Sequence, residues 1–178
     1  MGRRSRVKGS TFERKVASMI LKAAGSAFTK KDCYRTPMSG GHPHAGESDL
    51  IISPKLQAFF PYCVEIKHRK TWRPDRVWRA KADEAEFLNQ VIDASCRDEF
   101  GRKPLVVMRG NATEIFAAAK YKSLLCWVGD LDFSSLLQAE GSEFPGRILL
   151  FRHRSILWGM FLFTDMLEIL SRKTGNTV

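Results

Sequence analysis

The stretch that decides the fold is Ser48-Asp49-Leu50-Ile51-Ile52, followed after a proline-containing segment by Tyr62-Cys63-Val64-Glu65-Ile66-Lys67. Branched and aliphatic residues dominate both runs, and segments rich in proline or glycine bound them. That pattern predicts a short buried strand for each run. The segment between them, residues 54–61, contains two prolines and is predicted to be a turn.

Both predicted strands carry charge where a core strand is normally apolar. Side chains alternate along a strand, so Glu65 and Lys67 share one face. If the two strands are antiparallel neighbours, Asp49 lies across from Glu65. A buried pair of carboxylates is costly unless a cation compensates its charge. Two carboxylates at strand ends make a site of hard oxygen ligands, which Mg²⁺ prefers and which suits metal-assisted phosphodiester cleavage.

Asp49, a gap of 15 residues and then Glu65-Ile66-Lys67 resemble the motif of the PD-(D/E)xK nuclease superfamily. This spacing alone is weak, because it occurs by chance in many proteins. Three further features strengthen the resemblance. They are a glutamate, Glu13, on a predicted upstream helix, the segment Arg35-Thr36-Pro37-Met38-Ser39-Gly40-Gly41, and a strongly basic chain. Together these features resemble the Holliday junction resolvases of the archaeal and phage type, over roughly residues 8–109.

The resemblance implies a catalytic set of Glu13, Asp49, Glu65 and Lys67. Asp49 and Glu65 are expected to bind Mg²⁺, for which Mn²⁺ substitutes, and Glu13 completes the metal site directly or through water. Lys67 is expected to orient the attacking water. Glu13 also has a plainer interpretation, as a glutamate favoured by the helix dipole in the first turn. Ser48 stands where many members of the superfamily have proline, and proline is often absent there.

The fold expected from these patterns is α/β, with a restriction-endonuclease-like α-β-β-β-α-β core in which helices flank a central mixed sheet, plus a C-terminal α/β extension. One domain spans residues 1–178, divided into a basic arm (1–8), a catalytic core (9–109) and the extension (110–178). The core elements are a helix capped by Ser10 or Thr11 that ends near Ala24, strands over 32–38, 48–52 and 62–67, a helix over 79–97, and a parallel strand over 104–109.

Two further predictions concern the helix over 79–97. Its inward residues are expected to be Ala82, Ala85, Leu88, Val91, Ile92 and Ser95. Gln90 either faces the site, as a glutamine on this helix sometimes does in the superfamily, or is an exposed polar residue.

The extension is predicted from the same kinds of pattern. Its expected elements are helical residues 113–120, a strand over 124–128, a short helix over 131–138, strands over 147–151 and 156–163 joined at 153–155, and a last helix from Thr164 or Asp165 to about Ser171.

Charge points to a nucleic-acid partner. The net charge is +10, and residues 1–31 hold nine Lys and Arg against one acidic residue. Residues 67–81 hold seven against one, and this segregation favours a polyanion such as DNA over a membrane. The residues expected to contact DNA are Arg3, Arg4, Arg6, Lys8, Arg35, Ser39, Arg69, Lys70 and Arg73.

The apolar run in residues 148–163 is a candidate dimer interface. It holds more apolar residues than a terminal hairpin needs to cover one face, and an exposed apolar patch usually marks an association site. The alternative is that these strands extend the sheet and are buried within one molecule. A homodimer fits a resolvase, because two symmetric sites cut two symmetric strands.

Cellular context follows from what the chain lacks. Cys33, Cys63, Cys96 and Cys126 include no CxxC pair, so they are expected to be reduced thiols rather than zinc ligands. No secretory signal follows the basic N-terminus, and the apolar run over 156–163 is too short to cross a membrane. The expected location is the cytoplasm of a prokaryote or of a phage-infected host cell.

The sequence therefore predicts a metal-dependent, structure-selective DNA endonuclease, with a Holliday junction resolvase that acts on four-way junctions as the leading hypothesis. Four alternatives stay open. They are another nuclease of the superfamily that cuts flaps, nicks, ends or duplex sites, a non-catalytic DNA-binding module, an RNA-processing protein, and a structural protein whose motif is accidental.

Overall fold

The computed structural model describes residues 3–37, 48–74, 82–111, 113–128, 148–173 and 175, and it contains two β-sheets. In the smaller sheet, β1 (Cys33–Arg35) pairs antiparallel with β2 (Leu50–Ile52). The larger sheet has the order β3-β4-β5-β7-β6. Only its first pair is parallel, so the sheet is mixed, as predicted. Its strands are β3 (Tyr62–His68), β4 (Lys103–Arg109), β5 (Ile115–Lys120), β7 (Ile156–Leu162) and β6 (Leu149–His153).

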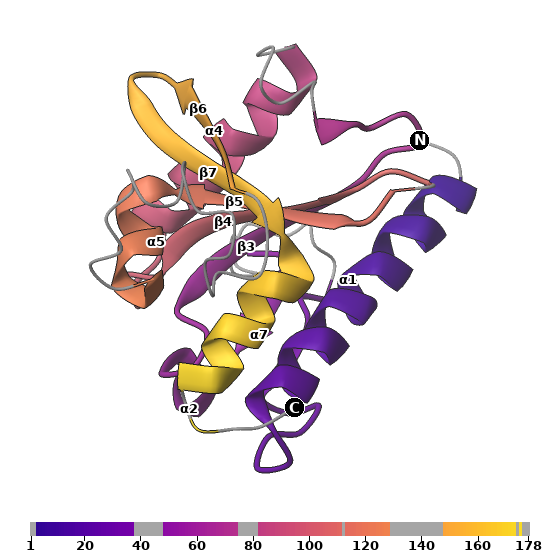
Figure 1. The fold of residues 1–178 in the computed structure, drawn as a ribbon. Helices are drawn as coiled ribbons and strands as arrows, with labels where there is room; N and C mark the ends of the chain where they lie inside the picture. Colours follow the sequence, from indigo (N-terminus) through magenta and orange to yellow (C-terminus); the bar gives the residue numbers. More distant parts are fainter. Residues whose placement is uncertain are drawn as a thin grey trace.

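Helices cover both faces of the larger sheet (Figure 1). α1 (Arg3–Ala24) and α7 (Phe163–Lys173) lie side by side on one face, and α4 (Ala82–Arg97) lies on the other. The alternation of side chains along the strands builds one apolar core on each side. In β4, for example, Leu105 belongs to the core beside α1, whereas its neighbour Val106 belongs to the core beside α4.

The order α1-β1-β2-β3-α4-β4 confirms the predicted core, with a short helix α2 (Pro54–Gln57) added in the predicted turn. The helical crossover from β3 through α4 to the parallel strand β4 is also as expected. One pairing differs. β2 forms its ladder with β1, so the segment that carries Asp49 reaches β3 only through the two residues before β2.

The predicted basic arm over residues 1–8 is wrong for the part that the structure describes, because α1 already begins at Arg3. Ser10 and Thr11 do not cap the helix. Their hydroxyl groups donate to the Val7 carbonyl oxygen at 3.1 and 2.9 Å, a bond that Ser and Thr make inside helices. The end of the helix is as predicted: Gly25 follows it with a φ of 93°, a conformation that glycine adopts without strain.

The start of the extension was assigned to the wrong elements. Residues 115–120 form β5 rather than a helix, and Tyr121–Val128 form the helix α5 rather than containing a strand. Ala117, Ala118 and Ala119 suggest a helix by propensity, but all three are fully buried in a strand that β4 and β7 flank. Tertiary packing here overrides local preference. The helix expected over 131–138 lies outside the described residues.

The two strands near the C-terminus are confirmed as β6 and β7. The turn between them has positive φ at Arg154 and Ser155, 47° and 63°, as in tight hairpin turns. The last helix, α7, is also confirmed, although it begins at Phe163 and reaches Lys173.

The apolar run over residues 148–163 divides into buried and half-buried side chains, the half-buried ones being Ile148, Leu149, Leu150, Ile156, Leu157 and Leu162, and a dimer contact there stays a prediction. β7 lies between β5 and β6, and Phe151, Trp158, Met160 and Phe161 are buried. None of the exposed large apolar side chains in the described part of the chain comes from this run. These strands extend the sheet, which was the alternative interpretation.

The buried face of α4 also differs from the prediction. Leu88 and Val91 are buried as expected, whereas Ala85, Ile92 and Ser95 are half-buried and the side chain of Ala82 lies outside the described set. Phe87 and Ala94 are buried in addition. No helix in the described part of the chain is long and apolar enough to cross a membrane.

Candidate active site

Asp49 lies along the outer edge of β3, fixed there by two backbone hydrogen bonds. Its own N–H donates to the Val64 carbonyl oxygen at 2.9 Å. The Ile66 N–H donates to Oδ2 of Asp49 at 2.6 Å. Because β3 is the edge strand of the larger sheet, these bonds place the Asp49 carboxylate directly beside the strand that carries Glu65 and Lys67.

Ser48 attaches this segment to β3 and was not predicted as a site residue. Its hydroxyl group accepts a hydrogen bond from the Val64 N–H at 2.9 Å and donates to the Val64 carbonyl at 3.1 Å. Thr36 supports it from the other side, since its hydroxyl group donates to the Ser48 carbonyl at 2.7 Å and its N–H donates to the Asp49 carbonyl at 3.0 Å. The sequence shows Ser48 only as a departure from proline and gives no signal for Thr36.

Glu65 and Lys67 project from β3 toward α4, as their shared face requires. Their neighbours across the parallel ladder are Val106 and Met108, which belong to the core on the α4 side. Nζ of Lys67 forms an ion pair with Oε1 of Glu65. Their side chains are 24% and 13% exposed, so the pair is mostly, but not fully, removed from water.

Glu13 reaches the site from α1, where Arg35 neutralises it. Nε of Arg35, on β1, forms an ion pair with Oε2 of Glu13, whose side chain is 12% exposed. Arg35 was predicted to contact DNA. The structure gives its guanidinium group a carboxylate partner, and its contact with DNA stays a prediction.

Electrostatics joins the four predicted catalytic residues into one site. Burial raises the pKa of Asp49 to about 7, and the charge of Glu65 and, more weakly, that of Glu13 push it in the same direction. The Ile66 N–H and Lys67 lower it. The Asp49 carboxylate therefore lies within electrostatic reach of Glu65, Glu13 and Lys67, and the catalytic roles of the four residues stay predictions.

The donor chemistry fits a hard divalent cation at Asp49 and Glu65. Both are carboxylates, and the pKa of Asp49 is raised first by burial and then by the charge of Glu65, two costs of ionisation that a bound cation would offset. Across the described residues, no three His, Cys, Asp or Glu side chains already stand as a group of metal ligands. Glu13 and Glu65 instead face Arg35 and Lys67. Of the three predicted metal ligands, Glu13 on α1 forms an ion pair with a residue of a different element, Arg35 on β1.

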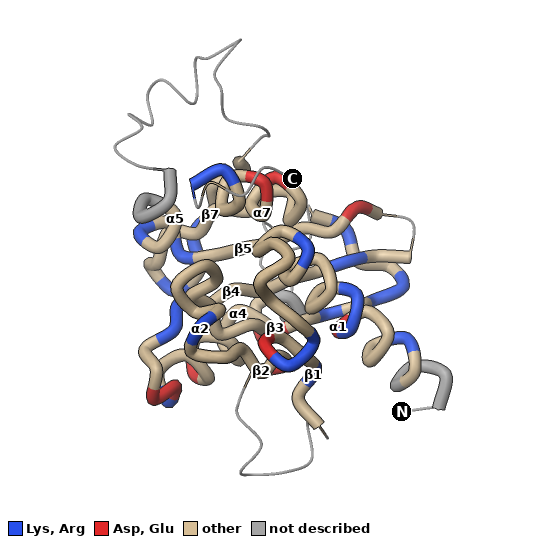
Figure 2. The backbone as a smooth tube through the Cα atoms, turned by 90° about the horizontal axis from the view of Figure 1, so that it is seen from below, with Lys and Arg blue, Asp and Glu red and all other residues tan. Residues whose placement is uncertain are grey.

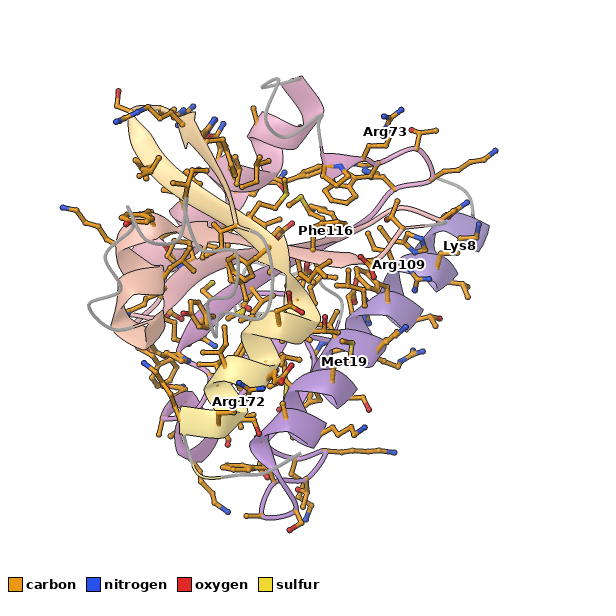
Figure 3. The ribbon with its side chains drawn as sticks, viewed as in Figure 1. Lys8, Met19, Arg73, Arg109, Phe116 and Arg172 are labelled. Atoms are coloured by element: carbon orange, nitrogen blue, oxygen red, sulfur yellow. The ribbon has the colours of Figure 1, made fainter. Side chains whose placement is uncertain are left out.

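Basic residues surround one end of the larger sheet. Lys8, Arg69, Lys70 and Arg73 are exposed. Figure 3 shows Lys8, Arg73 and Arg109 at the same end of the molecule, and Figure 2 shows Lys and Arg positions along α1 and beside it. Arg3, Arg4 and Arg6 lie on the first turns of α1, although their side chains are outside the described set, and Ser39 lies outside the described residues.

Two residues of α4 bear on the site, one predicted and one missed by sequence reasoning. The predicted residue, Gln90, donates to Oε1 of Glu86 on its own helix at 3.1 Å. Phe87 is the α4 residue that reaches the site: Nζ of Lys67 lies 5.3 Å from its ring centroid, and the guanidinium carbon of Arg69 lies 5.4 Å away. On an amphipathic helix a phenylalanine is indistinguishable from an ordinary core residue, so nothing in the sequence marked it.

Comparison with known proteins gives one family match. A family model described as "Phage putative PDDEXK endonuclease" matches residues 4–131, which include Glu13, Asp49, Glu65 and Lys67. Neither the curated proteins nor the solved structures contain a match.

Proposed function

The chain belongs to the phage PDDEXK endonuclease family, and from this premise we propose that it hydrolyses phosphodiester bonds in DNA with the help of a divalent metal ion. Membership of the family indicates a nuclease. The observation that supports the proposed site best is the position of the Asp49 carboxylate, which the Ile66 N–H fixes beside Glu65 and Lys67.

Asp49 and Glu65 would hold Mg²⁺, or Mn²⁺ in its place, and Glu13 would contribute directly or through water after separating from Arg35. The ion would neutralise charge on the phosphate and lower the pKa of the attacking water. Asp49 needs little reorganisation for this role, because backbone hydrogen bonds already fix its position.

Lys67 would orient the attacking water and stabilise the charge that develops on the phosphate oxygens. Its ammonium group has three N–H donors, and it forms an ion pair with Glu65. Lys67 lies two residues after Glu65 on the same face of β3, so one strand presents both a metal-binding carboxylate and a cation to the substrate.

Basic residues support DNA as the substrate. Lys8, Arg69, Lys70 and Arg73 are exposed, and Lys8 and Arg73 lie at the same end of the molecule. Contacts of this kind with phosphates position a nucleic acid without reading its sequence.

The finer proposal is a structure-selective enzyme that acts on four-way junctions as a homodimer, in the cytoplasm of a prokaryote or of a phage-infected cell. Its support is the resemblance of the motif and its context to junction resolvases. Two-fold symmetry would give the two matched cuts that a junction needs. Part of the 148–163 run is buried as the sheet is extended, and the half-buried apolar side chains Leu149, Ile156 and Leu157 are among those left for a dimer contact.

Cleavage assays test both the proposed nuclease function and the proposed preference for four-way junctions. The purified protein is incubated with a four-way junction, a flap, a nicked duplex and an intact duplex, each with Mg²⁺, with Mn²⁺ and with a chelator. We expect metal-dependent cleavage that leaves 5′-phosphates and favours the junction. Cleavage of flap or duplex in preference to the junction would contradict the finer proposal alone.

Matched variants test the site. Asp49→Ala, Glu65→Ala and Lys67→Ala should each abolish cleavage and leave junction binding intact, with Glu13→Ala impaired. Glu168→Ala is the control, because Glu168 is also a carboxylate paired with an arginine, Arg172, but lies on α7. Near-normal turnover of any of the first three variants would show that the site is misassigned.

A further inference from the structure

Phe87 on α4 is in contact with two cations that come from another element. Its side chain is buried, 3% exposed, in the core between α4 and the larger sheet. Nζ of Lys67, on β3, and the guanidinium group of Arg69, just after β3, both lie over its ring, at 5.3 and 5.4 Å from the centroid. Those distances are within the range in which an aromatic face attracts a cation.

An aromatic face holds a cation without using its hydrogen-bond donors. Glu65 forms an ion pair with Lys67, and that pair would weaken if Glu65 also held a metal ion. The attraction to the Phe87 ring does not depend on Glu65. Lys67 therefore keeps a fixed direction, with N–H donors left for the water and the phosphate oxygens.

Arg69 is held by its backbone as well as by the ring. Its N–H donates to the Arg109 carbonyl at 3.1 Å, and its own carbonyl accepts from the Trp72 N–H at 3.3 Å. With the backbone fixed, the ring of Phe87 is a contact among the described residues that directs the Arg69 side chain. Two cations attracted to one ring repel each other, and an anion bound to both relieves that repulsion.

We propose that Phe87 is a positioning residue that holds Lys67 and Arg69 for one phosphate group of the DNA backbone. The inference rests on the proposed nuclease function, and it adds a residue outside the motif and a reason for the phosphate to bind there. Lys67 serves the chemical step and Arg69 serves binding, so the ring influences both kcat and KM.

Steady-state cleavage kinetics test the role of the ring. Phe87→Leu removes the aromatic face, and Phe87→Tyr keeps it. We expect Phe87→Leu to lower kcat by about tenfold and to raise KM, whereas Phe87→Tyr stays near the wild type. Phe100→Leu is the matched control, because the Phe100 ring also carries a cation, Arg102 at 5.5 Å, but is 55% exposed and lies outside this core. It should leave both constants unchanged.

A spectroscopic measurement separates positioning from a loss of core packing. In protein labelled at lysine side chains, the ring current of Phe87 should shift the Lys67 Hε and Cε signals, which Lys67→Arg identifies by their disappearance. Phe87→Leu should move these signals toward those of exposed lysines, and Phe87→Tyr should not. If Phe87→Leu does not fold, Phe87→Met replaces it, because the longer and more flexible Met side chain adapts better to an irregular space.

Two results would overturn the inference. One is a folded Phe87→Leu or Phe87→Met protein with wild-type kcat and KM, and the other is a Lys67 signal that does not respond to loss of the ring. A wild-type protein that cleaves no DNA with Mg²⁺ or Mn²⁺ would instead remove the proposed nuclease function, and the Lys67 signal would still decide whether the ring holds this lysine.

Discussion

Gly110 lies directly against the backbone of Trp72, so close that a Cβ atom at position 110 would be 2.6 Å from the Trp72 carbonyl oxygen. Trp72 is 2% exposed, and its ring contacts Phe116 with centroids 5.5 Å apart. The segment that carries Arg69, Lys70 and Arg73 is thereby anchored through Trp72, whose backbone lies against Gly110 and whose ring packs on Phe116.

Gly110→Ala is expected to destabilise the protein by about 2 kcal/mol, because backbone must shift to admit the methyl group. Binding to DNA should weaken at the same time, since the basic segment moves with Trp72. Urea denaturation and fluorescence anisotropy with labelled DNA measure the two effects. Gly9→Ala is the control. It lies inside α1, its Cβ would meet only Oε1 of Glu13 at 3.7 Å, and it should raise stability by up to about 1 kcal/mol.

Ser48→Ala should cost about 1–3 kcal/mol, because the buried Val64 N–H loses its hydrogen-bond partner. It should also lower kcat, since the same segment positions Asp49. Chemical denaturation and cleavage kinetics provide the measurements. Ser95→Ala is a suitable comparison, because that hydroxyl group donates to the Ile92 carbonyl of its own helix. Equal losses of stability and of kcat in Ser48→Ala and Ser95→Ala would mean that Ser48 does not position the site.

The metal-free protein should become less stable as pH rises from about 4 to about 7. Burial raises the pKa of Asp49 from its ordinary value of 3.8 to about 7 in the folded state. The folded state therefore holds the Asp49 proton more tightly than the unfolded state does. The stability that this proton contributes is complete below pH 3.8 and is lost as the pH rises through about 7.

Thermal unfolding with a chelator and with millimolar Mg²⁺ measures this linkage across that range. Mg²⁺ competes with the proton, so it should raise Tm more at about pH 8 than at about pH 5. Asp49→Asn should remove most of the pH dependence and most of the gain from Mg²⁺. A Tm of the wild type that does not respond to Mg²⁺ at either pH would argue against a metal site at Asp49.

Replacing Arg69, Lys70 and Arg73 together with alanine should weaken binding to junction and duplex alike, because contacts with phosphates carry no sequence or branch information. The slope of log affinity against log salt should fall by about three if each residue neutralises one phosphate. Titrations at several salt concentrations give the slope. An affinity of the wild type that does not depend on salt would contradict this picture.

The sequence draws attention to a residue where that residue is conspicuous in its setting. Asp49, Glu65 and Lys67 were recognisable because charge is unusual in short apolar strands, and the structure brings them together. Ser48, Thr36 and Phe87 were not, because a polar residue before a strand and an aromatic residue on an amphipathic helix are ordinary. Their roles depend on which elements become neighbours, and one sequence does not specify that.

The errors in the fold have a similar origin. Residues 117–119 are alanines, which favour a helix in isolation, and only the space between β4 and β7 makes them a strand. The apolar run over 148–163 is long in part because its strands contribute to two cores at once, and the sequence does not show how much of the run this uses. Phe161 belongs to the core beside α1, and Trp158 and Met160 belong to the core beside α4.

The attachment of Ser48 and Asp49 to the edge of β3 also protects that edge from pairing with another molecule. An edge strand with free N–H and carbonyl groups can pair with a strand of another molecule, which leads to aggregation. Ser48 and Asp49 occupy the outward hydrogen-bonding groups of Val64 and the N–H of Ile66. Any change that detaches this segment would expose a strand able to template intermolecular β-pairing.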